Sequence, residues 1–277
     1  MLYTPIPSPG LAVSSLSEAM GELLREVSHK SVMPRFRRLS NADIEEKSPG
    51  DLVTIADREA ERLIAEGLTA IEPQARFVGE EACSRDPSLL QELDEGDVWI
   101  VDPIDGTGNY AAGRAPFALM AAYMRKGELV ASSIFNPVTN SLINAERGAG
   151  AWRDGRRLRA DQIHKPLADC RGIISGFQRP AAMAARLSAL ANEAGQTLPT
   201  QRCAGAEYPK VAAGEVDFAL YWRTLVWDHA PGVLILEEAG GKVARLDAAP
   251  YRPAGQSEPI LLAYNADIWD QAAAALA

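Results

Sequence analysis

The segment Trp99-Ile-Val-Asp-Pro-Ile-Asp-Gly-Thr107 is the clearest guide to how this chain folds. The apolar run Val98–Val101, which overlaps the start of this segment, is short and rich in β-branched residues, and this predicts a buried strand. The strand is expected to end at Asp102, and a second carboxylate, Asp105, follows three residues later. Pro103 stiffens the turn between them, so both carboxylates can point the same way. Such a pair suits a hard divalent cation such as Mg²⁺, which prefers oxygen ligands.

The remaining residues of this segment can complete a site around the cation. The backbone carbonyl of Ile104 is a further candidate oxygen ligand. Gly106 allows the chain to turn sharply, and Thr107 is then expected to open a helix or turn with free N–H groups. Because such N–H groups attract anions, the sequence predicts a phosphate cradle beside the carboxylates.

Two distant segments also place carboxylates beside apolar residues, namely Val78-Gly-Glu-Glu81 and Trp227-Asp-His-Ala-Pro-Gly232. Each has an ordinary explanation when taken alone. A Glu-Glu pair is usually a solvated surface pair, and Asp228 fits the N-cap of a helix that begins with His229. His229 itself is expected to cap or pack rather than to coordinate a metal. The combination of all three segments favours a metal site.

The order of these motifs resembles the inositol monophosphatase family. The motifs are Gly-Glu-Glu at 79–81, Asp-Pro-Ile-Asp-Gly-Thr at 102–107, and Trp-Asp at 227–228 followed by Glu-Ala-Gly-Gly at 238–241. The resemblance runs from about Lys47 to Ala263 and includes Lys47-Ser-Pro and Leu52-Val-Thr-Ile-Ala-Asp57. It implies an α/β (α+β) fold, a layered αβαβα sandwich of two sub-domains, and magnesium-dependent hydrolysis of a phosphate monoester.

The resemblance also implies which residues bind metal, with two or three Mg²⁺ per site. Glu80, Asp102 and the Ile104 carbonyl would hold the first ion. Asp102, Asp105 and Asp228 would hold the second, and Glu80 would also reach a third.

Catalytic and phosphate-binding roles follow from the same resemblance. Glu81 resembles the acid beside the reacting water, and Thr107 and Asp57 resemble the pair that orients this water or relays its proton. Gly106 and Thr107 would offer backbone N–H groups to the phosphate. No serine, cysteine or histidine nucleophile is required for this chemistry.

The sequence departs from the family where the substrate's leaving group would bind. Gly108 stands where many members have a second threonine, and Tyr221 stands where inositol-specific members have an acidic residue seven positions before Asp228. Tyr221 and Arg223 are candidate contacts to an aromatic or anionic leaving group; the alternative is a core aromatic strand with Arg223 on the surface. Glu207 is a candidate contact to a polar or cationic substrate, or a helix-surface residue.

Composition limits the class of partner. The 277 residues carry a net charge of −9 and a pI of about 5.0, which argues against general nucleic-acid binding or a two-metal nuclease. No apolar stretch is long enough to span a membrane, and Met1–Gly10 predicts a loose lead-in rather than a signal peptide. Three widely spaced cysteines, Cys83, Cys170 and Cys203, indicate reduced thiols in a cytoplasmic protein.

Periodicity predicts mixed helices and strands in one structural unit. We expect an N-terminal sub-domain at 1–155, carrying most metal ligands, and a C-terminal sub-domain at 156–277, carrying Asp228 and the substrate pocket. The expected helices are 14–36, 57–71, 179–194, 208–213, 229–238 and 266–276. The expected strands are 75–79, running into a loop with Glu80 and Glu81, then 98–101, 118–123, 129–135, 141–145, 172–175, 218–222 and 259–263. Gly148-Ala-Gly150 and Asp154-Gly155 mark a further hairpin.

The resemblance leaves the substrate open. Inositol 1-phosphate is the default, and histidinol phosphate, fructose 1,6-bisphosphate and 3′-phosphoadenosine 5′-phosphate are alternatives. A homodimer and inhibition by lithium are expected from the family. The rival of another class is a regulatory, protein-binding member with weak activity, although the complete set of acidic ligands argues against lost catalysis.

Overall fold

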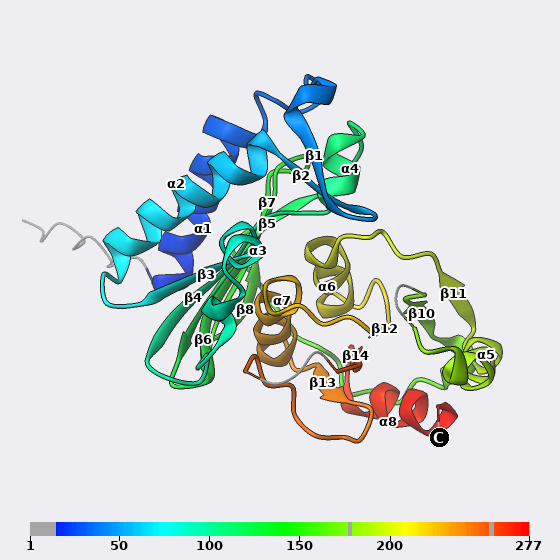
Figure 1. Cartoon of the computed structure of the whole chain (residues 1–277). Helices are drawn as coiled ribbons and strands as arrows, with labels where there is room; N and C mark the ends of the chain where they lie inside the picture. Colours follow the sequence, from blue (N-terminus) through cyan, green and yellow to red (C-terminus); the bar gives the residue numbers. More distant parts are fainter. Residues whose placement is uncertain (1–14, 177–178, 255–257, 277) are drawn as a thin grey trace, which may run out of the picture.

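The computed structural model describes residues 15–176, 179–254 and 258–276, and the predicted lead-in Met1–Gly10 lies outside them. Its elements form alternating layers of helix, sheet, helix, sheet and helix (Figure 1). Three clusters of buried side chains fill the space between these layers. The predicted layered αβαβα fold is confirmed.

The larger sheet has seven strands in the order β3-β4-β5-β6-β7-β8-β9. Only β3 and β4 are parallel, and every later neighbour is antiparallel. The strands are β3 (Arg76–Gly79), β4 (Asp97–Asp105), β5 (Ala118–Arg125), β6 (Glu128–Asn136), β7 (Ser141–Glu146), β8 (Gly150–Arg153) and β9 (Arg156–Leu158). The expected end of β4 at Asp102 was wrong, because the strand continues to Asp105 through an irregular register.

Two helices cover one face of this sheet, α1 (Leu16–Val27) and α2 (Ile55–Ile71). A π-helical turn, Ser28–Val32, extends α1. Their apolar stripes bury Leu24 and Ile64 against one set of alternating strand residues, including Trp99 and Tyr123. Thr54 and Asp57 form a capping box that fixes where α2 begins.

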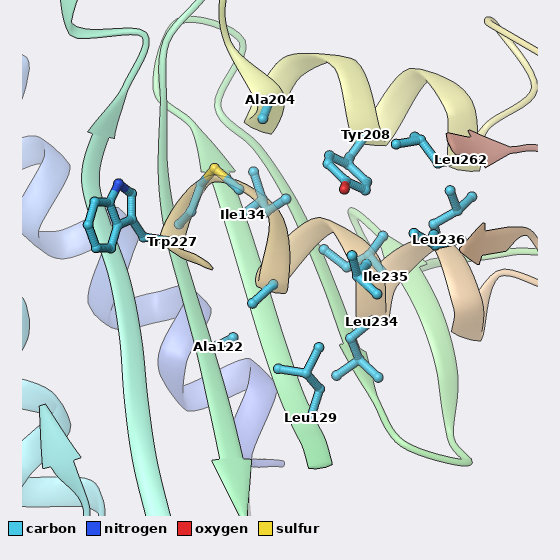
Figure 2. Packing of buried hydrophobic residues seen from close by; sticks show 14 of the residues in the cluster. Ala122, Leu129, Ile134, Ala204, Tyr208, Trp227, Leu234, Ile235, Leu236 and Leu262 are labelled. Atoms are coloured by element: carbon cyan, nitrogen blue, oxygen red, sulfur yellow. The ribbon is translucent and has the colours of Figure 1, made fainter. Parts of the chain in front are cut away.

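The opposite face packs against α6 (Ala204–Ala212) and α7 (Val226–Glu238), both of which begin earlier than predicted. Figure 2 shows Leu234 and Leu236 of α7 and Tyr208 of α6 in this cluster, with Ile134 and Leu129 from the sheet. Because α7 lies between two sheets, ten of its thirteen residues are buried.

The second sheet has five strands in the order β11-β10-β12-β14-β13, and α5 (Ala184–Glu193) and α8 (Ala266–Ala275) form the outer layer (Figure 1). Its strands are β10 (Arg171–Ile174), β11 (Gln196–Leu198), β12 (Phe218–Tyr221), β13 (Lys242–Arg245) and β14 (Ile260–Ala263).

Four short strands were not predicted. They are β11 and β13, and the hairpin of β1 (Ile44–Ser48) and β2 (Asp51–Thr54). The predicted loop with Glu80 and Glu81 is instead the first turn of α3 (Glu80–Arg85). Among the described residues, no helix is long and apolar enough to cross a membrane.

Candidate active site

The proposed metal ligands come from three distant segments and line one cavity of about 480 Å³, named here the metal cavity. Glu80 begins α3, Asp102 and Asp105 lie near the end of β4, and Asp228 lies in the first turn of α7. Ile104 lines the same cavity. Asp228 is not a helix N-cap, the ordinary alternative, because the cap of α7 is Leu225.

The irregular end of β4 separates the two aspartates in register. Asp102 pairs with Met120 and Asp105 pairs with Ala118, so one extra residue lies on β4. The Ile104 N–H donates to Asp102 Oδ1 at 3.0 Å, which closes this turn. Both carboxylates are buried, with exposed fractions of 2% and 8%.

Crowding of buried carboxylates raises their pKa values. Burial, then the charges of Glu80, Asp105 and Asp228, raise the pKa of Asp102 well above its usual range. Burial is also the main cause that raises the pKa of Asp105 to about 7. Burial, then the charges of Asp105 and Glu80, also raise the pKa of Asp228 well above its usual range.

Lys47 is the protein's own counter-ion at this cluster. Its Nζ lies 2.8 Å from Glu80 Oε1 and 2.9 Å from Glu81 Oε1. Burial lowers the Lys47 pKa, but the charges and hydrogen bonds of both glutamates outweigh burial and raise it. Six acidic residues line the metal cavity against three arginines, so acidic groups remain in excess even when Lys47 is counted.

This donor set fits a hard divalent cation. All the candidate donors are oxygen atoms, as Mg²⁺ requires, and burial leaves their charge without water to offset it. Within residues 15–176, 179–254 and 258–276, no three Asp, Glu, His or Cys side chains already converge to hold a metal. The candidate ligands therefore line a cavity rather than form a closed coordination sphere.

Thr107 and Asp57 meet as the sequence suggested. Thr107 Oγ1 lies 3.0 Å from Asp57 Oδ1 and 2.8 Å from the Ile104 carbonyl oxygen. Asp57 is fully buried, and burial raises its pKa to about 7 against the opposing hydrogen bond from Thr54. A hydroxyl has one proton, so it donates to one of these two acceptors at a time.

Gly106 supplies a backbone conformation that other residues rarely adopt. Its φ of 84° is left-handed, and it is the N-cap of the short helix α4 (Thr107–Ala111). A Cβ atom there would lie 3.1 Å from the Pro116 carbonyl oxygen and 3.2 Å from Cys203 Cβ. The turn therefore needs glycine both for its dihedral angles and for its close packing.

A second cavity of about 190 Å³, named here the leaving-group pocket, adjoins the metal cavity. Five residues line both cavities: Gly50, Asp105, Arg202, Arg223 and Asp228. Tyr221 and Glu207 line only the leaving-group pocket. The helix-surface alternative for Glu207 was wrong, because this residue is fully buried.

His229 packs as the sequence predicted. Its Nδ1 lies 3.0 Å from the Tyr208 hydroxyl, and its Nε2 lies 3.2 Å from the Arg223 carbonyl oxygen. Burial lowers its pKa to about 4, so the ring is neutral near pH 7. Both ring nitrogens are engaged, which leaves no lone pair for a metal.

The residues that the sequence prediction missed include Lys47, which hydrogen-bonds Glu80, and Thr200 and Arg202, which line the leaving-group pocket. Lys47 was quoted only as part of the Lys-Ser-Pro motif. Its position before a Pro-Gly turn and beside acidic residues was an available signal. Thr200 and Arg202 lie in a loop without periodicity, so only the structure reveals them.

Comparisons with known proteins agree with this geometry. The model of the "Inositol monophosphatase family" matches residues 12–276. The chain is 36% identical to an inositol-1-monophosphatase of Rhizobium meliloti, over 76% of this chain and 79% of that protein. It is 33% identical to a fructose-1,6-bisphosphatase/inositol-1-monophosphatase of Thermotoga maritima, over 80% and 81%. The structure of the extragenic suppressor protein suhB from Bartonella henselae aligns with a TM-score of 0.82 at 28% identity, covering 95% of this chain and 98% of that one.

Proposed function

The chain belongs to the inositol monophosphatase family and is thus a phosphatase of the phosphoric monoester hydrolase class; from this premise, we propose that it hydrolyses a small phosphorylated metabolite with Mg²⁺. Inositol 1-phosphate is the default substrate, since inositol-1-monophosphatase is the name of several relatives. Fructose 1,6-bisphosphate is the first alternative, because one relative is named for both activities. Histidinol phosphate and 3′-phosphoadenosine 5′-phosphate remain further alternatives.

One observation carries this proposal: carboxylates from α3, β4 and α7 line a single cavity with Thr107, whose hydroxyl lies within hydrogen-bonding distance of Asp57. Glu80, Asp102, Asp105, Asp228 and the Ile104 carbonyl would hold two or three Mg²⁺. When bound, Mg²⁺ would neutralise the phosphate, lower the pKa of water and stabilise the leaving oxygen.

The protein's own groups would position the reactants. Asp57 accepts the Thr107 proton at 3.0 Å, which would orient a lone pair of Thr107 Oγ1 toward the attacking water. Glu81, whose carboxylate is hydrogen-bonded by Lys47, would accept a proton from the same water. The backbone N–H groups at Gly106 and Thr107 would face the phosphate oxygens. Positioning and electrostatics of this kind do most of the work in phosphoryl transfer.

The test is phosphate release from the four substrates with Mg²⁺ and with EDTA. We expect magnesium-dependent release from at least one, and inhibition by lithium. Asp102→Asn should lower kcat by more than about 100-fold, because it removes a shared ligand. Its melting temperature in EDTA should not fall, since the substitution relieves repulsion among buried carboxylates. Retained turnover in this variant would contradict the assignment.

Three further expectations belong to the proposal: a homodimer, a cytoplasmic location, and a division into sub-domains at 1–155 and 156–277. Sedimentation of the purified protein tests the first. The second rests on three unpaired cysteines, all buried. For the third, β9 still pairs with the larger sheet, so limited proteolysis between Leu158 and Arg171 is the appropriate probe.

A protein-binding role is the second candidate. Relatives from Escherichia coli and Pseudomonas aeruginosa, at 32% and 33% identity, are named Nus factor SuhB. Weak turnover on all four substrates, together with a stable complex in pull-downs, would favour this role over metabolism.

A further inference from the structure

The only leaving-group pocket acid outside the proposed metal ligands is already occupied by protein donors. Glu207 Oε1 accepts from Thr200 Oγ1 at 2.8 Å and from the Gln201 N–H, and Glu207 Oε2 accepts from the Tyr221 hydroxyl. Three donors satisfy this carboxylate in a fully buried position. These three bonds occupy most of the acceptor sites of Glu207, which leaves it little capacity to bind the hydroxyls or the cation of a substrate.

The neighbouring polar groups are also engaged with one another. The Tyr221 hydroxyl donates its proton to Glu207 Oε2. Thr200 Oγ1 also accepts a hydrogen bond from the Arg202 N–H at 3.1 Å. His229 is hydrogen-bonded at both ring nitrogens, to the Tyr208 hydroxyl and to the Arg223 carbonyl oxygen. The wall of the pocket thus offers little hydrogen bonding to a polyhydroxylated leaving group.

Arginine supplies the positive charge at this wall. Arg202 and Arg223 both line the leaving-group pocket and the metal cavity, so they stand where the two cavities meet. Guanidinium groups are well matched to phosphate and carboxylate oxygens, which they bind with paired hydrogen bonds.

The backbone holds Arg202 in a strained conformation. Its φ of 54° is left-handed, which is uncommon for a residue other than glycine. Two hydrogen bonds hold this turn in place. The Gln201 N–H donates to the buried Glu207 carboxylate, and the Arg202 N–H donates to Thr200 Oγ1. Strain that surrounding structure maintains at a cavity is typical of functional positions.

We propose that the preferred substrate carries a second anionic group on its leaving group, and that Arg202 and Arg223 receive this group. The inference rests on the proposed phosphatase function and names its substrate class: a small metabolite with one phosphate ester to be cleaved and a further phosphate or carboxylate. The pocket volume of about 190 Å³ limits the leaving group to a small molecule. A neutral polyol such as inositol would bring no anionic group to either arginine.

Two matched pairs of phosphate esters show whether the second anionic group is a phosphate or a carboxylate. Fructose 1-phosphate and fructose 1,6-bisphosphate differ by a phosphate on the leaving group. Glycerol 3-phosphate and 3-phosphoglycerate differ by a carboxylate. We expect kcat/KM to be at least about tenfold higher for the member with the second anionic group in one pair, and that pair identifies the anion.

The variants are Arg202→Gln and Arg223→Gln, with Arg186→Gln as the charge-matched control. Arg186 is exposed on α5 and lines neither of these two cavities. Each of the first two variants should reduce the preference by about tenfold, mainly through KM, because kcat/KM should fall more for the member with the second anionic group than for its partner. Arg186→Gln should leave the preference unchanged.

Two results would overturn the inference. One is equal kcat/KM within both pairs in the wild-type protein. The other is an equal loss on both members of a pair in the variants, which would assign the arginines to the phosphate being cleaved.

Calorimetric titration with fructose 6-phosphate and with glycerate distinguishes this failure from failure of the proposed function. If no ester is hydrolysed but one of these ligands binds and loses affinity in both variants, the function fails and the anion site stands. If esters are hydrolysed and neither ligand loses affinity in the variants, the anion site fails and the function stands.

Discussion

Thr107 shows how much can depend on one hydroxyl group. Its oxygen lies within hydrogen-bonding distance of Asp57 and of the Ile104 carbonyl, a proposed metal ligand. Thr107→Val keeps the shape but removes the hydroxyl, and kcat should fall by about 100-fold with little change in KM. Steady-state kinetics on the best substrate measures this.

Thr107→Ser is the matched control, because it keeps the hydroxyl while it loses only a methyl group. It should retain kcat within about tenfold of the wild-type value. If the valine variant were as active as the serine variant, the hydroxyl would have no part in the reaction.

Glu61 on α2, which is not a proposed catalytic residue, should make the stability of the protein depend on pH. It is 4% exposed and accepts the Glu81 N–H at 2.7 Å. Burial, the largest cause, raises its pKa from 4.5 to about 7. As pH rises, the unfolded chain therefore releases this proton before the folded protein does. The contribution of Glu61 to the free energy of unfolding is fully present below about pH 4.5 and is lost as pH rises through about 7.

Glu61→Gln should remove this part of the pH dependence, because glutamine stays neutral and can still accept from Glu81. Each unit of pKa corresponds to about 1.4 kcal/mol, so the variant should gain relative to wild type between pH 5 and pH 8. Urea unfolding at the two pH values measures the difference. A constant difference between the proteins would show that Glu61 ionises normally in the folded state.

Among the elements, α6 and α7 meet without room for a side chain at Gly232. A Cβ atom there would lie 2.2 Å from Cγ of the buried Tyr208 ring. Gly232→Ala should therefore force the helices apart and destabilise the protein by about 1–3 kcal/mol. Activity should fall with it, since α7 carries Asp228. Gly108→Ala is the control, because a Cβ atom there meets nothing within 4 Å.

Prediction from sequence succeeded where elements had one clear period. The strands β5, β6 and β7 and the helix α2 were placed within two residues of their observed bounds. The starts of α6 and α7 were missed because their N-cap residues, Cys203 and Leu225, make no side-chain cap. Burial on nearly all sides also removes the polar stripe that marks a surface helix.

The site was predicted best where residues are adjacent in sequence and least where they meet only in space. Asp102 to Thr107 form one continuous motif, so their grouping was visible. The burial of Glu207 was not visible, because it depends on Thr200 and Tyr221 approaching from other elements. The hairpin β1–β2 was missed because β1 is charged and lacks an alternating apolar face, and β2 has only four residues.

For the whole molecule, the candidate ligands join the large sheet to the helix layer between the sheets. An ion bound by Asp102 and Asp228 would link β4 to α7, so Mg²⁺ should raise the melting temperature. At a concentration about 100-fold above Kd, the gain would be about 2.7 kcal/mol. Differential scanning calorimetry with Mg²⁺ and with EDTA measures it.

Asp228→Asn should remove most of the rise in melting temperature with Mg²⁺. Asp169 is an exposed residue in the second half of the chain, and Asp169→Asn should keep this rise. An equal magnesium effect in both variants would mean that the ion acts elsewhere on this acidic surface.

The spread of the candidate ligands along the chain also has a consequence for synthesis. Glu80, Asp102 and Asp105 leave the ribosome well before Asp228, and α7 then has to insert between two sheets, the second of which is completed only by β14. A nascent chain that stops before α7 could build much of the large sheet but would lack one proposed ligand and one wall of the pocket. Activity would therefore appear late and all at once, so that unfinished or truncated chains would not release phosphate from metabolites in the cell.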